Sequence, residues 1–288
     1  MSGEIVTRFA PSPTGLLHKG HAYAAFYAFE RAQGAGGEML LRIEDIDQTR
    51  CRLEFETAIL EDLNWLDLQW PEPVRRQSDH FTDYQKALEK LISKGLVYRC
   101  FKTRKEVLAE IARAPHLGAD GPEGPIFKGT PLPSNEEAAL IESGKVYAWR
   151  LNMQAAKEYL GGKWDTLCFH EEGVGPNGER GKINATPEIF GDVIIARKDV
   201  GTSYHIAAVH DDALQDISHV IRGQDLFFAS HLHRLLQELL ELPSPIYHHH
   251  KLLLDANGKK FSKRDQSVTI RSIRECGIKP EALKQEIL

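Results

Sequence analysis

Short apolar runs alternate with amphipathic stretches in the first third of the chain. Residues 5–9 and 38–43 are mostly apolar and predict two strands. Apolar side chains at helical spacing between residues 55 and 66, and again between 80 and 95, predict two helices. Strands that alternate with helices are typical of an α/β domain, so we expect a doubly wound parallel sheet of the Rossmann-like kind.

The same kinds of pattern return in the last third. Three further strands are predicted, at residues 192–198, 202–210 and 247–254. Leucines spaced along residues 227–242 predict a helix, which two prolines end. Two short helical segments are predicted after residue 264. This half therefore resembles a second set of strands and helices from one sheet.

The middle of the chain has a different composition. Prolines and glycines cluster between residues 115 and 133 and between 161 and 187, which indicates an α+β insert between two halves of the sheet. We predict four parts: a first half of a nucleotide-binding catalytic domain at 1–97, the insert at 98–190, the second half of the catalytic domain at 191–245, and a lysine loop with short helices at 246–288.

Composition narrows the class of protein. The 288 residues are 42% hydrophobic and 27% charged, and no apolar run is long enough to span a membrane. The N-terminus has no signal segment, and the four cysteines include no close pair, so we expect a cytoplasmic protein without disulfides. A net charge of −5 is unusual for a nucleic-acid binder, so basic surface would have to be confined to one face.

A turn rich in proline separates the first predicted strand from the helix after it. Two prolines and a glycine within residues 11–15 interrupt both kinds of element. The helix that follows would present unpaired backbone N–H groups, which suit phosphate. His18 and His21, with Gly20 between them, could hold a phosphate chain closely. The alternative is that both histidines are surface residues of an ordinary strand-to-helix turn.

A basic loop far along the chain changes this balance. Residues 258–264 read Gly-Lys-Lys-Phe-Ser-Lys-Arg, and alone such a loop is usually just solvated. Together with the turn at His18 and His21, however, it resembles the two signatures of the class I aminoacyl-tRNA synthetases. The resemblance implies that these enzymes' reaction, the activation of an amino acid by ATP with Mg²⁺, occurs here. It makes His18, His21, Lys260 and Lys263 the catalytic residues and places Gly20 against ATP.

Acidic residues follow the second predicted strand. At the carboxyl end of such a strand, side chains face the ligand site of an open α/β sheet. The Arg-Ile-Glu-Asp sequence that ends in Asp45 resembles the glutamate-specific synthetases and implies that Glu44 contacts the amino group of glutamate. Arg8 and Arg222 suit a carboxylate, because a planar guanidinium can bind it with two parallel hydrogen bonds. The resemblance also assigns three further residues to L-glutamate: Ala10, Ser12 and Tyr204.

Two features resemble the short paralogues of the glutamyl-tRNA synthetases. Ile46 stands where the longer enzymes usually have threonine, and no anticodon-binding domain follows the lysine loop. The short paralogues transfer glutamate to queuosine at the wobble position of tRNA(Asp). The resemblance therefore implies a monomer with L-glutamate, ATP and tRNA(Asp) carrying queuosine as its partners.

Three other interpretations stay open. The chain could be a catalytic fragment of a glutamyl-tRNA synthetase that charges the 3′ end of tRNA(Glu). It could be a nucleotidylyltransferase of the same superfamily, although the acidic cluster and the late lysines disfavour this. It could also be a binding module without catalysis, although such a module would be expected to lose both lysines.

The sequence lacks the zinc ligands that many relatives have. Cys100 is followed by Lys102 where those relatives have a second cysteine, and residues 127–131 contain neither the tyrosine nor the cysteine of the downstream pair. The three histidines at 248–250 would alternate between the faces of a strand and so do not converge easily. We therefore expect no structural zinc and a buried Cys100.

We predict that the purified protein carries less than one zinc per chain and folds in the presence of a chelator. The reason is that a zinc site needs about four ligands, and one thiol without a close partner is not a site. Elemental analysis and circular dichroism, recorded with and without chelator, test this. One tightly held zinc per chain would contradict it.

Overall fold

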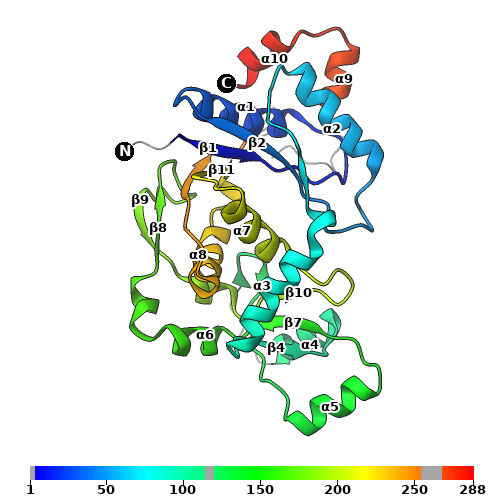
Figure 1. Cartoon of the computed structure of the whole chain (residues 1–288), viewed down its shortest axis with the longest axis vertical. Helices are drawn as coiled ribbons and strands as arrows, with labels where there is room; N and C mark the ends of the chain where they lie inside the picture. Colours follow the sequence, from blue (N-terminus) through cyan, green and yellow to red (C-terminus); the bar gives the residue numbers. More distant parts are fainter. Residues whose placement is uncertain (1–3, 114–119, 254–267) are drawn as a thin grey trace.

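Strands and helices alternate along the chain in the computed structural model, which describes residues 4–113, 120–253 and 268–288 (Figure 1). The strands are β1 (Val6–Phe9), β2 (Glu38–Ile43), β3 (Arg75–Arg76), β4 (Val97–Cys100), β5 (Asp120–Gly121), β6 (Gly124–Pro125), β7 (Ala148–Leu151), β8 (Cys168–Glu171), β9 (Gly181–Asn184), β10 (Ile194–Ala196), β11 (His219–Gly223) and β12 (Ile246–His250). The α-helices are α1 (Lys19–Gln33), α2 (Leu53–Trp65), α3 (Phe81–Ser93), α4 (Arg104–Arg113), α5 (Ser134–Glu142), α6 (Met153–Leu160), α7 (Tyr204–Leu214), α8 (Ala229–Leu240), α9 (Ile270–Glu275) and α10 (Pro280–Ile287). Short 3-10 helices are η1 (Gln77–His80), η2 (Gly161–Thr166), η3 (Pro187–Phe190) and η4 (Gln224–Leu226).

Parallel strands from both halves of the chain lie side by side. β1 pairs in parallel with β2, and β2 with β3. On the other side of β1, the backbone N of Ser218, just before β11, donates to the carbonyl O of Val6 at 3.0 Å. β11 pairs in parallel with β12, and β12 with β8. The strand order therefore reverses between β1 and β11, which confirms the doubly wound fold and places the expected ligand crevice at that point.

Helices cover both faces of this sheet (Figure 1). α1 and α2 pack on one face together with the C-terminal helices α9 and α10, around buried residues such as Phe26 and Leu63. α3, α7 and α8 pack on the other face around the leucines of α8. Because α8 presents a leucine on nearly every turn, it buries a continuous apolar stripe. None of the described helices is long and apolar enough to cross a membrane.

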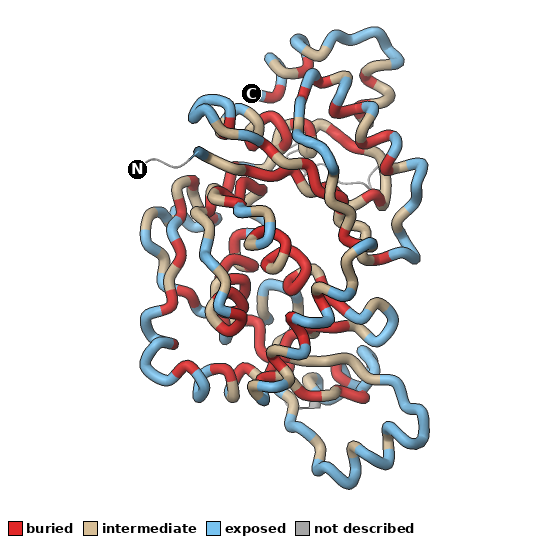
Figure 2. The backbone as a smooth tube through the Cα atoms, in the orientation of Figure 1, coloured by how far each residue is buried: buried red, intermediate tan, exposed pale blue. Residues whose placement is uncertain are grey.

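The segment predicted as an insert has two kinds of structure. β4 and β10 pair with β7 in a small antiparallel sheet, and Cys100 is buried there, as expected. α5 has no buried residue and lies at one end of the molecule (Figures 1 and 2). β8 and β9, however, form a pair that joins β12. Part of the predicted insert thus extends the sheet of the second half.

One predicted strand, at residues 202–210, is wrong. The structure has α7 there, from Tyr204 to Leu214. Seven of its residues are buried, namely 205 to 209 together with 211 and 212. A helix buried on nearly all sides shows no amphipathic period, so its tyrosine, isoleucine and valine resembled a strand. The neighbouring strand predictions are confirmed with shorter bounds, at β10 and β12.

A buried carboxylate ties α7 to the segment around β3 and α3. Asp211 has no solvent exposure. It accepts hydrogen bonds from Arg75 Nε at 3.0 Å, Gln77 Nε2 at 3.0 Å and the Tyr84 hydroxyl at 2.8 Å. Burial alone would raise the pKa of Asp211, but its hydrogen-bond partners and nearby cations outweigh burial and lower the pKa to about 2. The carboxylate is therefore charged in the folded protein at neutral pH.

We predict that Asp211→Asn lowers the free energy of unfolding by about 3 kcal/mol or more, because Arg75 and its neighbours lose a buried anion. Urea denaturation followed by circular dichroism measures the loss. Asp165→Asn makes the same change at an exposed position and should leave the midpoint unchanged. Equal midpoints for the two variants would show that Asp211 does not hold these elements together.

Candidate active site

The turn after β1 ends in two histidines that cap α1. His18 is the N-cap residue, and its Nδ1 accepts a hydrogen bond from the backbone N of Gly20 at 3.1 Å. In return, the backbone N of His18 donates to His21 Nδ1 at 3.2 Å. Because Nδ1 is the acceptor in both neutral rings, their protons lie on Nε2. The predicted strand, turn and helix are thus confirmed, with the positive end of α1 beside both imidazoles.

The chain beyond the lysine loop returns to this turn. Lys260 and Lys263 lie outside the described residues, so their predicted role is not tested. The structure resumes at residue 268, and Thr269 forms an antiparallel bridge with His18. The backbone N of Ile270 donates to the carbonyl O of Leu17 at 2.9 Å. The segment that follows the basic sequence at 258–264 therefore pairs with the turn that contains His18 and His21.

A cavity of about 370 Å³ opens at the carboxyl ends of the strands. Three of the predicted glutamate-binding residues line it: Ser12, Glu44 and Tyr204. Ala10 is half-buried in the turn after β1, and the carbonyl of the next residue, Pro11, accepts from the backbone N of Glu44 at 3.0 Å. The turn and the end of β2 are therefore held together at the cavity. His18, Gly20 and His21 do not line it.

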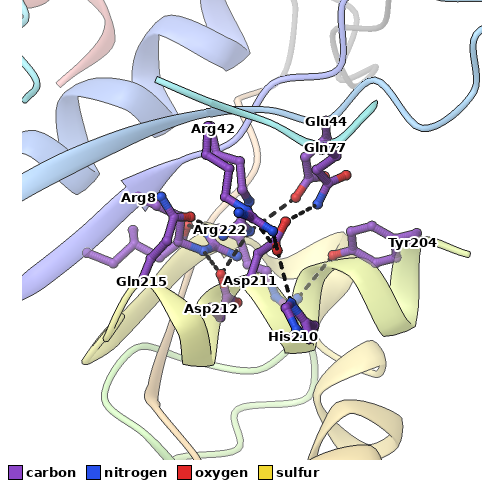
Figure 3. A network of polar contacts seen from close by, with 12 residues as sticks. Arg8, Arg42, Glu44, Gln77, Tyr204, His210, Asp211, Asp212, Gln215 and Arg222 are labelled. Carbon is purple, nitrogen blue, oxygen red and sulfur yellow. Dashed lines mark hydrogen bonds and ion pairs between the residues drawn. The ribbon is translucent and has the colours of Figure 1, made fainter. Parts of the chain in front are cut away.

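A chain of ion pairs leads to Glu44, which lines the cavity, and Figure 3 shows this network. Arg8 Nε contacts Asp212 Oδ1 at 3.0 Å, and the same oxygen contacts Arg42 NH2 at 2.8 Å. Arg42 NH2 in turn lies 3.2 Å from Glu44 Oε1. The Arg42 side chain has no solvent exposure. β1, β2 and α7 thus each contribute a charge to one continuous network.

Burial and charge act in opposite directions on the two acids of this network. Burial would raise the pKa of Asp212, but Arg8 and Arg42 outweigh it and lower that pKa. Burial is the larger effect at Glu44, whose pKa is raised despite the neighbouring Arg42. Arg42 itself has a raised pKa, because Asp212 and Glu44 overcome the effect of its burial. Asp212 is therefore ionised at neutral pH, and Glu44 is the acid of this network that lines the cavity.

Arg222, at the end of β11, is the second buried arginine of the site. Its NH1 donates to the Tyr204 hydroxyl at 3.3 Å, and its NH2 donates to Ser230 Oγ at 2.7 Å. Its guanidinium carbon lies 5.3 Å from the centre of the Tyr247 ring. Burial raises the pKa of Tyr204, so this hydroxyl stays protonated. Arg8 and Arg222 thus lie on the neighbouring strands β1 and β11, and neither of them lines the cavity.

The three consecutive histidines of β12 alternate between faces, as predicted. His249 lies on the inner side and contacts Glu171. The rings of His248 and His250 pack on the opposite side against α1, at 5.0 Å from Tyr27 and 4.9 Å from Tyr23, respectively. Across the described residues, no three histidine, cysteine, aspartate or glutamate side chains form a group that could hold a metal ion.

Sequence reasoning missed the acids that position the arginines. Asp211 and Asp212 fall at the end of α7, which the sequence misassigned as a strand. Read as a helix, this segment has Tyr204 and Asp211 seven residues apart and therefore on one face. That spacing would have brought the acid pair to the predicted site. Glu171 had no such signal, because its partner, His249, lies 78 residues away.

Comparison with known proteins agrees with the two motifs. Residues 4–288 match the family described as tRNA synthetases class I (E and Q), catalytic domain. A Rhodobacter capsulatus protein named glutamyl-Q tRNA(Asp) synthetase is 44% identical over 98% of this chain and 99% of its own length. A glutamate–tRNA ligase of Aquifex aeolicus is 35% identical over 97% of this chain but only 56% of its own length.

Solved structures have the same fold. A glutamate–tRNA synthetase from Elizabethkingia anophelis superposes with a TM-score of 0.74 at 28% identity, over 91% of this chain and 53% of that one. A glutamate tRNA ligase from Elizabethkingia meningosepticum, in complex with its amino acid, gives 0.72 at 28% identity, over 91% and 52%. This chain thus spans about half the length of these solved ligases. On the strength of the family match, the chain belongs to the class I tRNA synthetases of the glutamate and glutamine group, in their catalytic domain.

Proposed function

We propose that this chain activates L-glutamate with ATP and transfers it to queuosine at the wobble position of tRNA(Asp). The observation that carries the proposal is the 44% identity to the Rhodobacter capsulatus glutamyl-Q tRNA(Asp) synthetase over nearly the whole of both chains. The identity to the Aquifex aeolicus glutamate–tRNA ligase is lower, at 35%. We further propose that the enzyme acts as a monomer in the cytoplasm.

The charges around the cavity fit glutamate. Its two carboxylates need cationic partners, and Arg8 and Arg222 are both buried and oriented by hydrogen bonds. A planar guanidinium can bind a carboxylate with two parallel hydrogen bonds. The α-ammonium needs an acceptor, and Glu44 lines the cavity. Ser12 and Tyr204 add hydroxyl groups, and Ala10 lies in the adjoining turn.

The start of α1 fits the triphosphate of ATP. Backbone N–H groups at a helix N-terminus attract phosphate, and here His18, Gly20 and His21 stand at that end. From the sequence motif, Lys260 and Lys263 would add positive charge from the lysine loop. When bound, Mg²⁺ would neutralise charge on the phosphates, and it is commonly held by substrate phosphates and water rather than by a protein cage.

The proposed reaction consists of two successive nucleophilic substitution steps. A carboxylate oxygen of glutamate attacks the α-phosphorus of ATP, and pyrophosphate leaves. A hydroxyl of the queuosine cyclopentene diol then attacks the glutamyl carbonyl, and AMP leaves. The nucleophile belongs to a substrate in each step, so the chain's part is to place the reactants and to balance charge.

We predict that tRNA(Asp) from cells able to make queuosine accepts labelled glutamate, whereas the same tRNA from cells unable to make it does not. The reason is that the proposed nucleophile is a hydroxyl of the modified base. Acid-precipitable label measures the transfer. Transcribed tRNA(Glu), which has a normal 3′ ribose but no queuosine, is the matched control and should stay unlabelled.

Charging of tRNA(Glu) at its 3′ end, at a rate comparable with that of queuosine-containing tRNA(Asp), would contradict the proposal. It would instead identify the chain as the catalytic part of a glutamate–tRNA ligase. The 35% identity to the Aquifex aeolicus enzyme makes this the second candidate. Periodate oxidation of the terminal ribose blocks charging at the 3′ end. If the queuosine diol is protected or assayed separately, this treatment distinguishes transfer to the 3′ ribose from transfer to queuosine.

We predict that Lys263→Ala lowers the rate of glutamate-dependent pyrophosphate exchange about a hundredfold, because a charge-assisted contact to the developing negative charge is lost. The melting temperature should hardly change, since a loop lysine contributes little to folding. Lys259→Ala removes a charge from the same loop, outside the motif, and should have a small effect. Normal exchange with a lowered melting temperature would make Lys263 a structural residue.

A further inference from the structure

Arg222 is held in place by a buried chain of hydrogen bonds that ends at Glu171. Arg222 Nε lies 3.1 Å from His249 Nε2, and His249 Nδ1 lies 2.6 Å from Glu171 Oε2. We propose that His249 and Glu171 are positioning residues that fix the orientation of the Arg222 guanidinium toward a carboxylate of the substrate. This inference rests on the glutamate-binding role proposed above and names two residues that act behind that site.

The positions of the N–H protons determine which atom donates in each hydrogen bond between Arg222, His249 and Glu171. A guanidinium N–H can only donate, so His249 Nε2 must accept from Arg222. The neutral imidazole therefore carries its proton on Nδ1 and donates it to Glu171. Burial lowers the pKa of His249 to about 4, so the ring is neutral at neutral pH. Its partners on both sides thus specify one tautomer.

Glu171 is placed to hold that tautomer. Its side chain and that of His249 have no solvent exposure. It ends β8, which pairs in parallel with β12. Its second oxygen, Oε1, accepts from the backbone N of His249 at 2.9 Å. Both carboxylate oxygens therefore contact one residue, and the imidazole can neither rotate nor exchange its proton without losing a buried hydrogen bond.

The other hydrogen bonds of Arg222 occupy only part of its guanidinium, so N–H groups remain for a carboxylate. Nε donates to His249, NH2 to Ser230 and NH1 to Tyr204, while the Tyr247 ring lies against the guanidinium. These hydrogen bonds to described residues use three of the five N–H donors of the guanidinium. Because each nitrogen has one fixed direction, the two other N–H groups have fixed directions too.

An isosteric change at Glu171 should reverse the tautomer. In Glu171→Gln the side-chain amide can donate to His249 Nδ1, which moves the imidazole proton to Nε2. Nε2–H would then face the N–H of Arg222, donor against donor. The substitution barely alters volume, so its effect on Arg222 comes from hydrogen-bond direction and charge rather than from packing.

We predict that Glu171→Gln raises the KM for glutamate about tenfold or more, the equivalent of one charge-assisted hydrogen bond. The KM for ATP and the kcat of pyrophosphate exchange should stay near their wild-type values. Equilibrium dialysis with labelled glutamate checks the same loss without turnover. Glu172→Gln is the matched control: it neutralises the adjacent glutamate, which pairs with Arg31 at 2.7 Å instead, and should keep wild-type affinity.

A second pair of variants decides the matter if Glu171→Gln does not fold. His249→Gln keeps an amide oxygen that can accept from Arg222, whereas His249→Leu has no acceptor. Tighter glutamate binding by His249→Gln than by His249→Leu supports the inference, and equal binding overturns it.

Two results with Glu171→Gln overturn the inference. One is unchanged glutamate affinity in a folded variant. The other is a lower melting temperature with kcat and both KM values affected alike, which would mark a general structural role. Failure of the wild-type chain to bind glutamate would contradict the proposed function itself, and so is distinguishable from both.

Discussion

Charged side chains removed from water determine how the centre of this protein is built. Asp212 is buried and is shared by Arg8 and Arg42, which come from two different strands. Desolvation of each ion alone would be costly, and removal of one partner leaves the others uncompensated. β1, β2 and α7 must therefore meet at one point, and the alignment of the two halves of the sheet is tied to that meeting.

The same constraint explains where the ligand site lies. Parallel strands diverge where their order reverses, and this divergence opens a crevice at their carboxyl ends. Glu44 lines the cavity and pairs with the buried Arg42, so the network of buried ions reaches the cavity wall at this residue. The bridge between Thr269 and His18 brings the C-terminal helices to the same edge. Fold and site thus share their polar contacts.

Local patterns in the sequence were enough to predict several of the elements and residues around the site. The turn before α1 was predictable because prolines, glycine and the following helix formers lie within a few positions, and Glu44 because it directly follows a clear strand. α7 was not, since burial on nearly all sides removed its amphipathic period. Glu171 and Asp212 were not either, because their partners lie 78 and more than 100 residues away and only the folded sheet brings them together. The lysines of the second motif lie outside the described residues.

Because several histidines are buried, the stability of this fold depends on pH. Burial lowers the pKa of His231 and of His249 to about 4 each, and that of His233 also well below its ordinary value. In an unfolded chain the same rings would take up protons near pH 6.5. Between about pH 6.5 and 4 the unfolded chain therefore binds more protons, and stability falls as the pH falls through this window. In the folded chain the rings of His231 and His249 stay mostly uncharged from neutral pH down to about pH 5. Acidification acts on these histidines by favouring unfolding, and it does not tune their charge as a sensor would.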